Sequence, residues 1–109
     1  MGVAASARLL GAAVAWRRLA VPSAGRALAR ALTAGEQERT IAGMGLVQAG
    51  ERSVRVLEVE MQRLGPSPLM VRVLADIGGP DAAGLLRRIA AGDGEAACLA
   101  RECLDDGGA

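Results

Sequence analysis

Glycine and proline divide the C-terminal two thirds of this sequence into segments of similar length. Breaks fall at Gly35, Gly50, Gly65-Pro66, Gly78-Gly79-Pro80, Gly92-Asp93-Gly94 and Gly107-Gly108. The intervals of about 12 to 15 residues match the usual length of a helix in a globular protein. The spacing of the breaks therefore predicts a series of short helices.

Within these segments, apolar residues recur every three or four positions, as they do along one face of a helix. The stripes are Ala82, Leu85, Leu86 and Ile89; Ala96, Leu99, Ala100 and Cys103; Val54, Leu57, Met61 and Leu64; and Leu69, Val73 and Ile77. Asp81 follows Pro80 where a helix would start, a position that suits both proline and a carboxylate. We therefore expect a mostly α-helical fold.

A competing interpretation makes residues 53–77 a β-hairpin. Five valines in this stretch are β-branched and suit strands, and Gly65-Pro66-Ser67-Pro68 would form the loop. However, Leu57 breaks the strict alternation that a half-buried strand needs. We favour two helices here, and a small α+β domain is the alternative.

An internal repeat of 29 residues emerges when Gly50 is placed over Gly79. The run Val71–Ala83, in which a helix ends at a small-residue turn and Pro-Asp-Ala opens the next, resembles short HEAT-type helical repeats. The resemblance covers residues 39–106 and implies about two and a half units of short antiparallel helical hairpins. Stacked repeats normally need three or more units to bury a continuous core.

The charges divide the chain at Gly35. Residues 1–35 hold five arginines and no acidic residue, whereas residues 36–109 hold eight arginines and all twelve acidic residues. The formal charges of the two parts are therefore +5 and −4, although the whole chain carries only +1. Such asymmetry indicates two parts with different tasks. We expect a targeting segment at 1–35 and a small helical domain at 36–109.

The N-terminal segment resembles a mitochondrial presequence, which is rich in arginine, poor in acidic residues and forms a basic amphipathic helix. In helical projection, Arg26 and Arg30 lie opposite Leu28 and Leu32. The run from Arg30 to Gly35 also resembles the arginine–apolar–small pattern of presequence processing sites. The resemblance implies a helical or disordered leader with a basic face, recognition by the mitochondrial import machinery, and a matrix location. Its processing region would comprise Arg30, Ala31, Leu32 and Gly35, with cleavage near Ala31.

Other interpretations of the leader fit the sequence less well. A secretory signal would use Leu9–Trp16 as its apolar region, but Arg17 and Arg18 follow directly behind it. No run approaches the roughly 18 apolar residues that a transmembrane helix needs. An arm that binds nucleic acid would interleave aromatic residues with its arginines, and the chain has a single aromatic residue. We expect neither a transmembrane segment nor a nucleic-acid partner.

The composition predicts a weak core in residues 36–109. The chain lacks Lys, His, Asn, Phe and Tyr, so its core must come from Leu, Val, Ile, Met and many alanines. Alanine buries little apolar area, and apolar burial contributes roughly 25 cal/mol per Å². A domain of about 70 residues is also close to the lower limit for folding alone. We therefore expect open apolar surface that an unidentified protein partner covers.

Few residues indicate chemistry. The chain has no histidine, which is the commonest general base and metal ligand. Cys98 and Cys103 would lie about 140° apart around a helix, an arrangement that suits neither a disulfide nor a zinc site. We predict no catalytic residue, no cofactor and no metal. Arg87 and Arg88 form the one compact basic spot in the acidic part, either as a solvated helix face or as a partner contact.

Together these features predict a mitochondrial helical adaptor, assembly factor or accessory subunit that acts by protein binding. The main alternative is a short, inactive isoform of a mitochondrial enzyme. A third interpretation is a reading frame without function, since Ala, Gly, Arg and Pro share G/C-rich codons.

Overall fold

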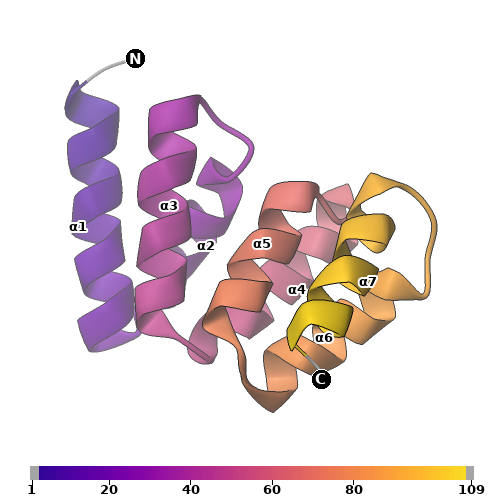
Figure 1. Ribbon diagram of the computed structural model, residues 1–109. Coiled ribbons are helices and arrows are strands. Elements are labelled where there is room, and N and C mark those ends of the chain that lie inside the picture. Colours follow the sequence, from indigo (N-terminus) through magenta and orange to yellow (C-terminus); the bar gives the residue numbers. More distant parts are fainter. Residues whose placement is uncertain (1–2, 108–109) are drawn as a thin grey trace.

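The computed structural model describes residues 3–107, which form seven α-helices (Figure 1). These helices are α1 (Val3–Leu19), α2 (Pro22–Ala31), α3 (Glu36–Ala49), α4 (Arg52–Leu64), α5 (Pro68–Ile77), α6 (Gly79–Ala90) and α7 (Glu95–Gly107). The expected mostly α-helical fold is confirmed. The alternative β-hairpin at 53–77 is wrong, because this stretch forms α4 and α5.

Local capping explains why the stretch from 65 to 68 connects two helices. The Ser67 hydroxyl accepts a hydrogen bond from the Met70 backbone N–H at 3.2 Å, and Pro68 occupies the first helical turn, where its missing N–H leaves no gap. Gly65, with φ at 85°, ends α4 in a conformation that other residues rarely adopt. The valines of α4 and α5 are therefore held on helices despite their preference for strands.

The helices form two groups in an elongated molecule of 39 × 26 × 23 Å. In the first group, α1 and α3 lie side by side and α2 packs against both (Figure 1). Helices α1 and α3 run parallel, because Ala13 meets Gly45 and, further along both helices, Arg17 donates to Gln48. In the second group, α6 packs against α7, and α5 contacts both of them as well as α3.

One apolar core runs through both groups. Leu28 of α2, Leu46 of α3, Leu57 of α4 and Leu74 of α5 are completely buried. Trp16 of α1 is also buried, with only 6% of its surface exposed. Residues 3–35 therefore supply core side chains, and the expected division at residue 35 does not coincide with a break in the packing. The targeting role of this segment stays a prediction.

The HEAT-type arrangement also stays a prediction. Helices α6 and α7 pack together, as the two helices of one repeat unit would. Helix α4, however, packs against α2, which lies outside the expected repeats, and against α3 and α6, which belong to other units in the expected scheme. The fold is thus an irregular helical assembly around a shared core.

Two helix crossings depend on glycine. A Cβ atom on Gly25 would lie 2.8 Å from ring atoms of Trp16, and a Cβ atom on Gly45 would lie 2.8 Å from the Cβ of Ala13. Such distances are shorter than van der Waals contact, so α1 can approach α2 and α3 this closely only where the side chain is absent.

Replacement of Gly25 by alanine tests the first of these crossings. We expect Gly25→Ala to lower the free energy of unfolding by about 1–3 kcal/mol, because the added methyl group displaces the indole ring. Gly11→Ala is the matched control: it lies in α1 with open space around it, and should stabilise the helix by about 0.5–1 kcal/mol. Urea titration followed by circular dichroism measures both. Equal effects of the two substitutions would contradict the packing described here.

Candidate functional site

The N-terminal segment that resembles a presequence lies folded against the rest of the chain along one interface. We call this interface the seam: it joins α1 and α2 on one side to α3 and α4 on the other. Arg26 and Arg30, the predicted basic face, are exposed. In the predicted processing region, Arg30 and Gly35 are exposed, whereas Ala31 and Leu32 are buried at 9% and 4% exposure. The fold therefore hides the middle of this region.

A chain of buried hydrogen bonds crosses the seam at Trp16. The indole Nε1–H donates to the Ser53 hydroxyl at 2.9 Å, and this hydroxyl donates to the Leu46 carbonyl at 2.7 Å. Ser53 is completely buried. Because a buried donor without a partner destabilises the folded state, these bonds fix both the position and the orientation of the indole. They link α1, α3 and α4 through a single side chain.

Backbone contacts add to this link at the end of α1. The Arg52 guanidinium donates to the carbonyls of Trp16 and Arg17 at 3.0 and 3.2 Å. These carbonyls lie in the last turn of α1, where a positive charge is favourable; the Trp16 carbonyl also accepts the Ala20 backbone N–H at 3.2 Å. Ala20, directly after the helix, has φ at 52°, which is strained for a residue with a Cβ. The contacts with α4 therefore help to hold this turn in a backbone conformation that alanine rarely adopts.

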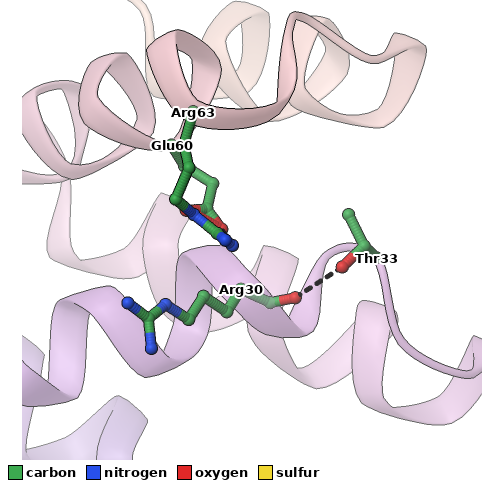
Figure 2. Close-up of polar contacts among 4 residues, drawn as sticks. All are labelled: Arg30, Thr33, Glu60 and Arg63. Atoms are coloured by element: carbon green, nitrogen blue, oxygen red, sulfur yellow. Dashed lines mark hydrogen bonds and ion pairs between the residues drawn. The ribbon is translucent and has the colours of Figure 1, made fainter.

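Carboxylates lie on the α3 and α4 side of the seam, opposite arginines of the N-terminal segment. Glu60 is only 5% exposed and accepts two hydrogen bonds from the Arg63 guanidinium at 2.9 and 3.1 Å. Arg30 of α2 lies across the seam from this pair (Figure 2). The pKa of Glu60 is lowered, chiefly by the hydrogen bonds from Arg63 and further by the positive charges of Arg63 and Arg30. Burial opposes this shift without reversing it.

A second buried carboxylate lies near the start of α3. Glu38 is 8% exposed, and its carboxylate accepts the Gly35 backbone N–H at 3.3 Å. This is one half of a capping box, because glycine has no side chain to return the bond. Glu38 also lines a cavity of about 390 Å³ together with Arg8 and Arg30. At two points, the seam thus places basic side chains of the leader, residues 1–35, near acidic side chains of the body, residues 36–109.

Arg87 and Arg88, the predicted partner contact, line two different hollows of the surface. Arg88 makes an ion pair with Glu58 across α6 and α4, at a groove of about 580 Å³ between these helices. Arg87 lines a different and smaller cavity between α5, α6 and α7. Glu51 and Asp81 lie in the first groove, and the pKa of Glu51 is raised by hydrogen bonding and charge repulsion from Asp81. The groove is therefore lined by charges of both signs.

The sequence pattern does not single out Trp16, Ser53 or Arg52, which hold the seam together. Two signals could have found them. Trp16 is the only aromatic residue in the chain, so it is the largest group available to a core otherwise built from aliphatic side chains. Ser53 precedes Val54 and lies four positions before Leu57, on the buried face of its helix, where a hydroxyl needs a partner.

The two cysteines lie on α7 as free thiols, with Cys98 exposed and Cys103 half-buried. Within residues 3–107, the Cys, Asp and Glu side chains form no group of three or more that could hold a metal ion. None of the helices in this range combines the length and the apolar character needed to cross a bilayer.

Comparisons with protein-family models, with curated proteins and with solved structures find no match for this chain. Its function must therefore be inferred from the residues and contacts described above. Among these contacts, those of the seam connect the predicted targeting segment, residues 1–35, to the rest of the chain.

Loss of the Ser53 hydroxyl tests the buried hydrogen bonds. Ser53→Ala leaves the indole N–H of Trp16 without an acceptor, so we expect the free energy of unfolding to fall by about 1–3 kcal/mol. In a double-mutant cycle with Trp16→Phe, the two substitutions should couple by about 0.5–2 kcal/mol. Thr40→Ala, which removes an exposed hydroxyl bonded to the Glu36 carbonyl, is the control and should change stability by less than about 0.5 kcal/mol. Strict additivity in the cycle would show that the bond is absent in solution.

The lowered pKa of Glu60 predicts a dependence of stability on pH. Its ionised form is favoured in the folded chain, so its contribution is present above the pKa of the unfolded state and is lost as the pH falls through the folded pKa. Glu60→Gln should therefore lower stability at pH 7 and flatten its decline under acidic conditions. Unfolding in urea between pH 7 and pH 3 measures this, with the exposed Glu102→Gln as control. A Glu60→Gln curve parallel to that of the unaltered chain would rule out the ion pair.

Proposed function

We propose that this chain is a mitochondrial helical accessory protein or adaptor, which acts by binding another protein. The observation that carries the proposal is the run of five arginines without any acidic residue in positions 1–35. This pattern is typical of presequences, which import machinery recognises by positive charge and amphipathic helix. The strong amphipathicity of α2, with Arg26 and Arg30 on one edge and Leu28 on the other, supports it.

Burial of the processing region determines when import and cleavage take place. Ala31 and Leu32 lie in the core, so a peptidase reaches the bonds around them only while α2 is detached from α3 and α4. Cleavage therefore acts on the chain before it folds, which agrees with the passage of an unfolded chain through an import channel. A chain that has already folded keeps its leader.

Exposed apolar surface supports the part of the proposal that concerns protein binding. A groove of about 420 Å³ between α3 and α5 is lined by Met44, which is 57% exposed, and by the half-buried Val47 and Leu69. Methionine adapts its shape readily to a partner surface. On α4, Val59 and Leu64 are more than half exposed as well. Apolar side chains exposed in this way provide surface that a protein partner covers.

A tagged full-length chain expressed in cells tests location and processing together. We expect mitochondrial fluorescence and a mature N-terminus within residues 31–39 when the purified protein is sequenced. The double substitution Arg26→Gln and Arg30→Gln should reduce import at least several-fold, because it removes the basic face. Arg87→Gln with Arg88→Gln is the matched control, since it removes the same charge from the body. Cytosolic, unprocessed protein would refute the proposal.

A further inference from the structure

Removal of α1 and α2 would open a face on α3 and α4. Ser53 is completely buried and accepts the indole N–H of Trp16, and Leu28 of α2 packs at Gly45. Without the cover these groups would meet water, and an apolar face exposed in this way is a site for protein association. In the full chain α1 and α2 cover this face, so their residues show which side chains fit against it.

The shape of the face favours a docking helix that has small residues at the crossing and carries one flat aromatic ring. At Gly45 the covering helix approaches so closely that Ala13 already fills the space a Cβ would need. A helix that docks here therefore needs alanine or glycine at the crossing. The Ser53 hydroxyl donates its proton to the Leu46 carbonyl, so its remaining role is to accept. An indole, which is flat and carries a donor but no acceptor, matches this site.

The charge of the face selects against acidic partners. Residues 36–109 carry a formal charge of −4, and the cover at 1–35 carries +5 without one carboxylate. Glu38 and Glu60 are both less than a tenth exposed beneath the cover. Arg8 and Arg30 of the cover line the same cavity as Glu38, and Arg30 also lies opposite Glu60 (Figure 2). A carboxylate placed at these points would be repelled at short range.

We propose that this face is the docking site of the chain, and that its partner supplies two helices which take the place of α1 and α2. These helices are rich in alanine and glycine where they cross α3, free of acidic residues along the seam, and carry a tryptophan that donates to Ser53. Because this role presupposes removal of the leader, it rests on the function proposed above. The leader then has two roles. It targets the chain to mitochondria, and until its removal it occupies the site that the partner later binds.

The experiment uses the full chain with a site-specific protease sequence inserted after Ala34, in the exposed turn between α2 and α3. After cleavage, the leader fragment is separated from the rest of the chain, a fluorescent synthetic peptide of residues 3–32 is added as the probe, and its binding is followed by anisotropy. We expect saturable uptake by the cut chain, and none by the uncut chain, whose face is occupied. A Trp16→Ala peptide should bind at least about tenfold more weakly. A Leu10→Ala peptide, altered at a side chain 56% exposed on α1, should bind within about twofold of the unaltered one.

Two results would overturn the docking site. One is the absence of saturable uptake by the cut chain, and the other is equal binding of the Trp16→Ala peptide and the unaltered peptide. Both measurements are made on purified protein and do not depend on where the chain goes in a cell. Failed uptake with correct mitochondrial processing therefore refutes the docking site alone. Uptake combined with a cytosolic, unprocessed chain refutes the mitochondrial function, and with it the removal of the leader that would open the face in the cell.

Discussion

The contact between one indole ring and one serine hydroxyl positions the first two helices of this protein. Trp16 lies against Gly25 on α2 and donates to Ser53 on α4, while Ser53 in turn holds the end of α3 through the Leu46 carbonyl. Leu28 and Leu32 complete the burial from the leader side. Because the remaining core side chains are aliphatic or small, no other group of this size is available to join the helices. The arrangement of the N-terminal half thus depends on this side chain.

The course of the chain can be predicted from its local pattern, because glycine and proline mark the helix ends so regularly. The stripe Ala82, Leu85, Leu86 and Ile89 is buried as expected, since these positions face one direction on an isolated helix. The prediction for α5 is less accurate: Val73 is buried, but Leu69 and Ile77 are only half-buried, and the buried face includes Met70, Val71 and Leu74. This helix packs against α3, α6 and α7 at once, so a single stripe underestimates its buried face.

The seam is harder to predict, because its parts are distant in sequence. Trp16 and Ser53 lie 37 positions apart, and no local rule connects them. The charge asymmetry indicates a role for the arginines of the leader but does not predict where its apolar side chains pack. Leu28 and Leu32 were expected only as the apolar edge of an amphipathic helix, yet they pack into the common core. An amphipathic helix has the same sequence pattern whether a receptor or the chain itself covers its apolar face.

The leader therefore meets two requirements with one set of residues. Its arginines remain at the surface of the folded chain, where they neutralise part of the negative charge of the body. Leu28, Leu32 and Trp16 add core volume to an alanine-rich body of about 70 residues, a size at which a chain buries a small share of its surface. A body deprived of these side chains would have to recover the lost burial elsewhere, so the proposed removal of the leader would also change its stability.

Concealment of Ala31 and Leu32 has a kinetic consequence. Helical domains whose contacts are mostly local in sequence fold fast, within microseconds to milliseconds. If the chain is imported as proposed, newly made molecules divide between two fates, according to whether translocation or closure of the core comes first. The ratio of shortened to intact protein in a cell would then report the outcome of this competition. Conditions that slow folding, or chaperones that hold the chain open, would shift the balance towards the shortened form.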